Sequence, residues 1–364
     1  MDTRIILAGG FLGAGKTTLL LEAAKRLASR GKRAGLVTND QAPELVDTAL
    51  LRAAGSKVEE VSGSCFCCNF PGFAAALQSL ATDADVVLAE PVGSCVDLSA
   101  TILQPLKDGK AGAFSVAPLS VLADPKRLQD ILEGGNAGLH ESSAYIYRKQ
   151  LEEADFIVLT KADAWQGPPL ATRTQTAFPN AKVFTVSSRT GEGMDAWLDA
   201  VMTQGDAGRT VLREVDYDVY AEGEAVLGWL NVTYELTSET AQDWRAFAEQ
   251  LLDGLGCAFD AANAAVGHVK GVVSSGGSLV AANLTGARET LETRGGAMTG
   301  KAATLTLNAR TQMAPAELEA VVNARMAGAC GGGITARPVA WRCLSPGYPR
   351  PTHRYEKATY SVST

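Results

Sequence analysis

One glycine-rich stretch, GFLGAGKT over residues 10–17, constrains the fold of this chain more than any other feature. A short apolar run over residues 4–8 precedes it, and residues 17–29 place leucine and alanine at helical spacing after it. A strand, a glycine turn and a helix N-terminus in this order direct backbone N–H groups and the positive end of a helix dipole at a polyphosphate. The sequence therefore predicts a phosphate-binding loop that binds a nucleoside triphosphate.

The side chains of this loop have distinct expected roles. Lys16 is predicted to reach the β- and γ-phosphates and to support catalysis, and Thr17 is predicted to ligate Mg²⁺. Thr18 should lie near the α-phosphate. The remaining nucleotide contacts of the loop are expected from Gly10, Gly13, Ala14 and Gly15.

Strand and helix patterns alternate up to about residue 200, which is typical of a parallel sheet with crossover helices. The expected strands are residues 5–8, 34–38, 86–90, 156–160 and 182–186. The expected helices are residues 17–29, 42–54, 72–81, 126–132 and 142–154. In such a sheet ligands gather at the carboxyl ends of the strands.

The pattern changes after a stretch of small polar residues at 204–208, which is typical of a linker. We therefore predict an α/β P-loop NTPase domain with a mostly parallel sheet over residues 1–208 and a smaller α+β domain over residues 209–364. In the second domain the expected strands are residues 225–236, 268–274, 279–284, 304–310 and 335–343, and the expected helices are residues 240–255 and 315–326.

An acid-ended strand follows the P-loop. Residues 85–90 read as a buried strand that ends in Glu90, and Gly93 comes three residues later. A carboxylate there would hold Mg²⁺ through water and serve catalysis, while the Gly93 N–H would sense the γ-phosphate. The alternative is a strand that merely ends in glutamate, and its place after a P-loop favours the nucleotide role.

Two later motifs indicate guanine. Asp163, in LTKAD over residues 159–163, could accept two hydrogen bonds from guanine N1 and N2, while the stem of Lys161 covers the base. Ser187 and Ser188 follow another strand and would offer backbone N–H groups to the guanine carbonyl. Adenine has no matching donor pair, so these motifs favour GTP over ATP.

The second unusual feature is a crowded group of thiols, Cys65, Cys67 and Cys68. If the segment is extended, Cys65 and Cys67 share one side, and a turn at Asn69 brings Cys68 round. Three thiolates with an open fourth position suit Zn²⁺ or Co²⁺ and permit transfer. Buried apolar thiols and redox sensing are the alternatives. Cys95 could face the same site or be a buried thiol.

Composition limits the partners and the compartment. A net charge of −7 gives no electrostatic signal for nucleic acid or an anionic membrane. No apolar stretch has the length of a membrane span, and the first residues already read as a strand instead of a signal peptide. Seven cysteines, an odd number with three crowded together, do not resemble a disulfide framework, so a reducing cytoplasm is expected.

Taken together, GGFLGAGKTT at residues 9–18, the Cys-x-Cys-Cys motif and Glu90-x-x-Gly93 resemble the CobW family of GTP-binding metallochaperones. That family is related to the urease, hydrogenase and methylmalonyl-CoA mutase accessory GTPases. The resemblance covers residues 1 to about 200 and is weaker beyond, where residues 267–271 are similar to the family's C-terminal domain. It implies a GTPase whose Mg²⁺-GTP site is coupled to a transferable Zn²⁺ or Co²⁺. The sequence itself shows no convincing arginine finger and no well-placed glutamine for the attacking water, so slow hydrolysis by the chain alone is expected. By position, it assigns Lys16, Thr17 and Glu90 to Mg²⁺-GTP, Asp163 to the base, and Cys65, Cys67 and Cys68 to the metal.

The chain departs from the family pattern at three places. Thr160 stands where the family usually has Asn before the base-reading Lys. After the second strand only Asn39 and Asp40 match, which leaves Asp40 as a candidate catalytic residue. EPVGSC at residues 90–95 replaces the more usual Glu-Thr-Thr-Gly and resembles a branch associated with corrinoid methyl transfer.

The expected partners are a client metalloprotein or corrinoid enzyme and, in a nucleotide-dependent homodimer, a second copy of the chain. Two other functions stay open at this point. One is a P-loop kinase for a small molecule, which leaves the thiols and Asp163 without a role. The other is a binding module that senses GTP or metal without turnover and docks on a corrinoid enzyme.

Overall fold

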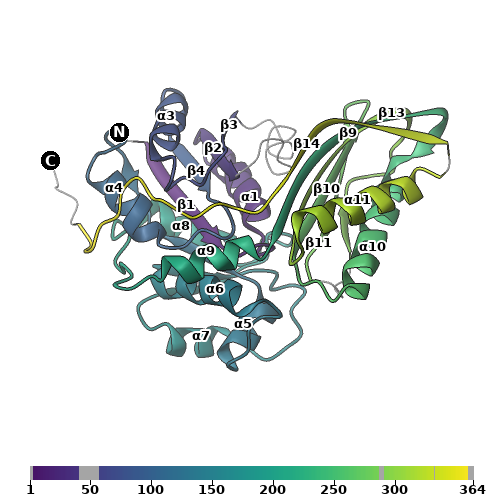
Figure 1. Cartoon of the computed structure of the whole chain (residues 1–364). Helices are drawn as coiled ribbons and strands as arrows, with labels where there is room; N and C mark the ends of the chain where they lie inside the picture. The colour runs from purple at the N-terminus through teal and green to yellow at the C-terminus, as the bar shows by residue number, and fades with distance from the viewer. Residues whose placement is uncertain (1–2, 41–56, 287–290, 332, 360–364) are drawn as a thin grey trace.

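The computed structural model describes residues 3–40, 57–286, 291–331 and 333–359, and of Asp40 only the backbone. Figure 1 shows two sheets side by side, the first with helices on both faces and the second with its two helices on one face. The first sheet has the order β3-β2-β4-β1-β6-β7-β8, with β5 beside β1, and all its pairings are parallel. This is the predicted α/β class, and it brings the carboxyl ends of β1 and β4 together.

The strands of this sheet are β1 (Arg4–Gly10), β2 (Ala34–Asp40), β3 (Lys57–Ser62), β4 (Val86–Glu90), β5 (Ser115–Val116), β6 (Ser120–Ala123), β7 (Phe156–Leu159) and β8 (Lys182–Thr185). The helices of this region are α1 (Lys16–Ser29), α3 (Phe70–Ala81), α4 (Gln104–Lys107), α5 (Pro125–Leu132), α6 (Glu141–Glu153), α7 (Ala171–Ala177), α8 (Met194–Thr203) and α9 (Tyr217–Ala225), with a π-helical turn over Ser99–Leu103.

The five strands expected here from sequence are confirmed to within two residues at either end. Strands β3, β5 and β6 were not predicted from the sequence. β6 is a central strand of only four residues, and all four are buried, so neither length nor alternation identified it. The helix expected over residues 42–54 lies outside the described residues.

The second sheet has the order β12-β11-β10-β13-β9-β14 and is antiparallel, and with its two helices it forms the predicted α+β arrangement. Its elements are β9 (Gly228–Asp243), α10 (Trp244–Ala261), β10 (Val266–Ser275), β11 (Ser278–Leu284), β12 (Glu292–Arg294), β13 (Thr299–Thr311), α11 (Pro315–Ala329) and β14 (Ile334–Leu344). The helix expected from residue 240 begins at Trp244, because the Asp243 side chain accepts hydrogen bonds from the backbone N–H groups of Arg245 and Ala246. Ala225 belongs to α9 and not to the expected strand, which begins at Gly228.

Two segments after residue 208 pack on the first sheet's side of the molecule. Helix α9 lies against α6, and its Tyr220 is buried in the same apolar core as Leu7 and Phe66. After β14 the chain turns back and crosses the helices of the first sheet toward α4, as the yellow segment in Figure 1 shows. In the described part of the chain no helix is both long and apolar enough to span a membrane.

Candidate nucleotide and metal site

A cleft of 610 Å³ lies where the two sheets meet. The P-loop, the carboxyl end of β4 and the loops after β7 and β8 line one wall, and strands β9 to β13 of the second sheet line the other. Most of the nucleotide-binding residues predicted from sequence line it: Gly13, Gly15, Lys16, Thr17, Thr18, Glu90, Gly93, Thr160, Lys161, Asp163 and Ser188. Gly10, Ala14 and Ser187 lie behind this surface, and the Asp40 side chain is outside the described residues.

The P-loop wraps closely around its lysine. The Lys16 ammonium donates a hydrogen bond to the Gly10 carbonyl at 2.9 Å. Gly10 has φ of 125°, and a Cβ there would lie 2.4 Å from the Leu122 carbonyl oxygen, so only glycine fits beside β6. The lysine is therefore held across the loop at the N-terminus of α1.

Oxygen ligands meet at the end of β4. The Thr17 hydroxyl donates to the Glu90 carboxylate at 3.1 Å, and both side chains are buried. Hydroxyl and carboxylate oxygens are ligands that Mg²⁺ prefers, so this pair fits the predicted magnesium site. Three residues further on, a Cβ at Gly93 would lie 3.0 Å from the Lys16 Nζ, which places the Gly93 backbone beside the lysine.

The loops after β7 and β8 also meet. The Ser187 hydroxyl donates to Asp163 at 2.5 Å and Arg189 donates to the other carboxylate oxygen at 2.6 Å. The Ser187 bond, followed by that from Arg189, keeps the pKa of Asp163 below its ordinary value. The Thr160 hydroxyl donates to the Ala14 carbonyl at 2.9 Å, so this threonine ties the base-reading loop to the P-loop.

The second wall of the cleft was missed by the sequence analysis. Lys270 on β10 places its Nζ 3.5 Å from the Thr17 hydroxyl, and Arg310 on β13 also lines the cleft. His268 is buried, and burial followed by the charge of Lys270 lowers the pKa of its imidazole well below the ordinary value. Residues 267–271 resemble the family's C-terminal domain, but nothing in the local sequence indicates that they face the P-loop.

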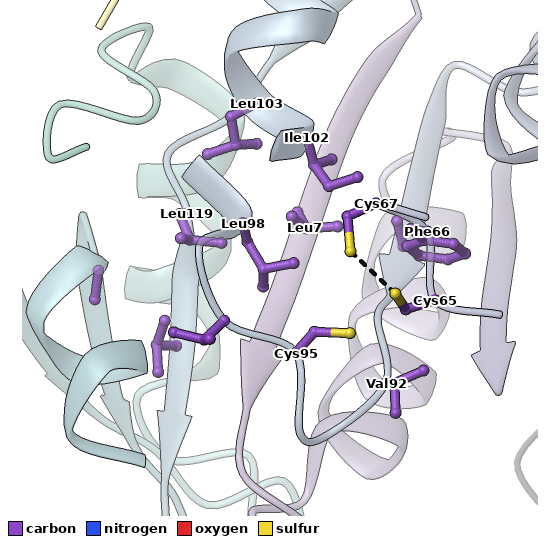
Figure 2. Close-up of a cluster of buried hydrophobic side chains, with 14 of the residues drawn as sticks. Leu7, Cys65, Phe66, Cys67, Val92, Cys95, Leu98, Ile102, Leu103 and Leu119 are labelled. Atoms are coloured by element: carbon purple, nitrogen blue, oxygen red, sulfur yellow. Dashed lines mark hydrogen bonds between the residues drawn. The ribbon is translucent and has the colours of Figure 1, made fainter. Parts of the chain in front are cut away.

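The three clustered thiols are brought together as predicted, but by a turn and not by an extended segment. The sulfurs of Cys65, Cys67 and Cys68 all lie within 4.8 Å of one another. Cys65 and Cys67 are 3.0 Å apart, as the dashed line in Figure 2 marks, and Cys67 and Cys68 are 3.9 Å apart. The turn closes because the N–H groups of Cys68 and Asn69 both donate to the Cys65 carbonyl.

These thiols differ in acidity. Hydrogen bonds among them, first between Cys65 and Cys67, lower the pKa of Cys65 well below the ordinary thiol value and raise that of Cys67. The bond with Cys65 is also the main cause that raises the pKa of Cys68 to about 11. One thiolate is therefore favoured within the cluster, and the thiolate is the form that binds a metal.

Asn39, at the end of β2, connects the thiol loop to the cleft. Its side-chain N–H₂ donates to the carbonyls of Val61 and Ser64, both at 2.8 Å, and its oxygen accepts from the Phe66 N–H at 2.7 Å. The same residue lines the cleft. A change at this corner of the cleft therefore acts directly on the segment that carries the thiols.

The C-terminal segment, residues 345–359, covers the thiol cluster. The Arg350 N–H donates to the Cys68 sulfur at 3.1 Å and the Thr352 N–H to the Cys67 carbonyl at 2.8 Å. Further along, Arg354 donates to the buried Asp97 carboxylate at 2.7 Å. Nothing in the composition of this segment indicates what it covers, so the sequence alone assigns it no role.

Residues 4–183 match the family model "CobW/HypB/UreG, nucleotide-binding domain". This part of the chain belongs to that family. The chain is 34% identical over 170 residues to the zinc chaperone YeiR of Escherichia coli K12, a match that covers 44% of this chain and 47% of the relative. The chain is also 28% identical over 199 residues to the zinc chaperone CobW of Pseudomonas aeruginosa. That match covers 46% of this chain and 51% of the relative. The chain thus spans about half the length of the curated relatives that it matches.

Among solved structures, the hydrogenase maturation factor HypB of Helicobacter pylori, in complex with nickel, is 18% identical. That alignment covers 55% of this chain and 86% of that chain, with a TM-score of 0.40.

Proposed function

We propose that this chain is a GTP-hydrolysing metallochaperone that holds Zn²⁺ at Cys65, Cys67 and Cys68 and passes it to a client protein. One observation carries the proposal: three thiols gather on a loop that Asn39 ties to the nucleotide cleft. The family of the nucleotide-binding domain and its two zinc-chaperone relatives agree with this function.

In this proposal the P-loop binds the triphosphate through its backbone, with Lys16 on the β- and γ-phosphates. Thr17 and Glu90 hold Mg²⁺, which neutralises phosphate charge during hydrolysis. Gly93 senses the γ-phosphate, and Asp163, with Lys161, Ser187 and Ser188 beside it, selects guanine. Asp40 stays a candidate for catalysis on its sequence position alone. Because neither an arginine finger nor a water-positioning glutamine was identified from sequence, we expect slow turnover by the isolated chain.

Zinc is the proposed cargo because thiolates suit it and because both curated relatives carry the name zinc chaperone. Co²⁺ occupies the same tetrahedral frame. The EPVGSC sequence, which resembles a branch associated with corrinoid methyl transfer, keeps cobalt and a corrinoid-enzyme client as the second version of the proposal.

The coupling of the two sites is the property to test. If GTP orders the loops that carry the thiols, metal affinity rises on Mg²⁺-GTP binding, and by linkage GTP affinity rises equally on metal binding. Zn²⁺ and Co²⁺ should be titrated into nucleotide-free, GDP-bound and GTP-analogue-bound protein. We expect a coupling of roughly 1–3 kcal/mol in favour of the GTP-analogue form. Equal affinities in all three states would contradict the chaperone mechanism.

The same preparation separates the two other functions. A P-loop kinase would produce a phosphorylated small molecule, whereas the proposed reaction yields GDP and phosphate alone. A non-turnover sensor would act on its client in stoichiometric amounts with a non-hydrolysable GTP analogue, whereas the proposed chaperone needs hydrolysis to release its metal.

A further inference from the structure

A fourth thiol faces the cluster from another element. Cys95 lies on the loop after β4, five residues beyond Glu90 and two beyond Gly93, and it is 1% exposed. Figure 2 shows its sulfur directed toward the sulfurs of Cys65 and Cys67. Its thiol lies near enough to those of Cys65 and Cys67 for each to affect the pKa of the other. It is not one of the three sulfurs that all lie within 4.8 Å of one another, so it stands at the margin of the cluster.

We propose that Cys95 is the fourth ligand of the metal. In this proposal Cys95 binds the metal when GTP is bound and dissociates from it after hydrolysis. This inference rests on the proposed function and assigns a specific residue to the coupling between its two sites.

The chemistry of the pocket favours a protein thiolate as fourth ligand. Zinc bound by three thiolates is completed to a tetrahedron by one more ligand, often water in open sites. Here Val92, Leu98 and Ile102, all 4% exposed or less, lie around Cys95, so this thiol is enclosed by protein on the side of the cluster where a fourth ligand is needed. The buried Glu224 carboxyl also acts on the Cys95 thiol. With Zn–S bonds of about 2.3 Å, tetrahedral sulfurs lie roughly 3.8 Å apart, close to the 3.9 Å between Cys67 and Cys68.

The loop that carries Cys95 begins at the nucleotide. Gly93 lies beside Lys16, and two residues of extended chain span at most about 7 Å, so a displacement of Gly93 is passed to Cys95 over a short distance. The Gln150 side chain donates to the carbonyls of both Gly93 and Cys95, at 3.0 and 2.7 Å, and holds the two together. Between them, the Ser94 hydroxyl donates to the buried Glu224 of α9 at 2.5 Å.

This arrangement supplies a route for transfer. With GTP bound, Gly93 is held at the γ-phosphate and Cys95 completes a closed site of four thiolates. After hydrolysis the loop relaxes, the zinc–sulfur bond to Cys95 breaks, and a donor atom of the client forms a bond in its place. The metal stays divalent throughout, and the released Cys95 thiolate takes up the proton that the client's donor loses on binding.

The test compares Cys95→Ala with Cys68→Ala as a matched control. Zn²⁺ affinity is measured for wild type and both variants in the GDP-bound and GTP-analogue-bound forms. We expect Cys95→Ala to retain the GDP-state affinity and to lose the gain from GTP, which for a coupling of ordinary size is roughly 5–150-fold. Cys68→Ala removes a ligand that is present in both states, so its affinity should fall in both while the gain from GTP persists.

X-ray absorption at the zinc edge gives a second readout that does not depend on affinity. We expect four sulfurs at about 2.3 Å in the GTP-analogue form of wild type, and three sulfurs with one lighter atom in the GDP form and in Cys95→Ala. GTP binding by each variant confirms that it is folded. Cys257→Ser, at an exposed thiol, should leave four sulfurs.

Two failures can be told apart. If wild type binds no zinc, or binds it equally in all nucleotide states, the proposed function itself is wrong. If wild type shows the gain from GTP but Cys95→Ala shows the same gain, or if wild type has three sulfurs with GTP analogue bound, the role of Cys95 is wrong and the proposed function stands.

Discussion

The nucleotide cleft and the thiol cluster adjoin in the same part of the molecule but are built in opposite ways. The cleft is a space of 610 Å³ between two sheets, and the wall formed by the first sheet comes from short, contiguous motifs. The thiol cluster is closed: Cys65 and Cys67 are 5% and 2% exposed, and the C-terminal segment lies over them. A nucleotide can therefore exchange with solvent at the first site, whereas a metal at the second can leave only when a covering segment or a ligand moves.

The largest expected effect comes from a substitution that impairs the nucleotide cleft and leaves the thiol cluster intact. Lys16→Ala should abolish GTP hydrolysis and weaken GTP binding by on the order of several kcal/mol, because a charge-assisted contact to the phosphates is lost. Zinc binding by the nucleotide-free protein should be unchanged, since the thiols lie on a different loop. GTPase assays and zinc titrations check both halves. Normal turnover in this variant would rule out the P-loop assignment.

The second-largest expected effect comes from loosening the C-terminal segment that covers the thiol cluster. Arg354→Ala leaves Asp97, which is fully buried, without the cation that now contacts it. Breaking a buried ion pair in this way should lower the free energy of unfolding by about 3 kcal/mol, and the loosened C-terminal segment should let zinc escape faster. Urea unfolding and the rate of zinc transfer to a chelator measure the two effects.

Arg350→Ala is the matched control for this change. Its contact with Cys68 is made by the backbone N–H, which alanine retains, so both stability and zinc release should stay near wild type. Equal release from the two variants and wild type would mean that the C-terminal segment does not retain the metal.

A smaller effect alters only which base the cleft selects. Asp163→Asn should reduce GTP affinity by about 1–3 kcal/mol, because the guanine N1 and N2 donors lose their charged acceptor. It should also shift preference toward xanthine nucleotides. Competition binding of GTP, ATP and XTP gives the ranking. Arg189→Ala, which removes a competing partner but keeps the carboxylate, should retain the preference for GTP. Equal binding of ATP and GTP by wild type would contradict the role of Asp163.

The smallest expected effect is a pH dependence of the free energy of unfolding, and it comes from the buried carboxyl of Glu153. Glu153 accepts a hydrogen bond from the Ser99 N–H at 2.8 Å, and burial, followed by the charge of Asp97, raises its pKa to about 8. A raised folded-state pKa gives stability that is complete below the unfolded value of 4.5 and is lost as pH rises through about 8. Between pH 7 and 9 we expect a loss on the order of 1 kcal/mol.

Glu153→Gln should remove this part of the pH dependence, because the amide does not ionise. Burial also raises the pKa of Glu224 to about 8, so the variant should retain the similar pH dependence of stability that Glu224 contributes. Denaturant midpoints at pH 7 and 9 provide the measurement. If the change in denaturant midpoint between pH 7 and 9 is the same in Glu153→Gln as in wild type, this carboxyl is already ionised in the folded protein at neutral pH.

The sequence by itself determined the features whose geometry depends on only a few neighbouring residues. The P-loop, the acid at the end of β4 and the three adjacent thiols could be predicted because a strand, a tight turn and a helix start fix neighbouring atoms with little help from the rest of the chain. The fold class followed from the alternation of strands and helices over the first 200 residues. Even here the four buried residues of β6 carried no periodic signal, so a central strand was missed.

Tertiary structure decided everything that depends on distant segments meeting. Lys270 faces Thr17 across 253 positions of sequence, and the Arg350 N–H reaches the Cys68 sulfur across 282. The sequence likewise left open whether Cys95 faces the other thiols, and the path of the loop between β4 and Ser99–Leu103 settled its direction. Such contacts follow from how sheets and helices bury their apolar faces against one another, and that packing is a property of the whole chain that no local pattern records.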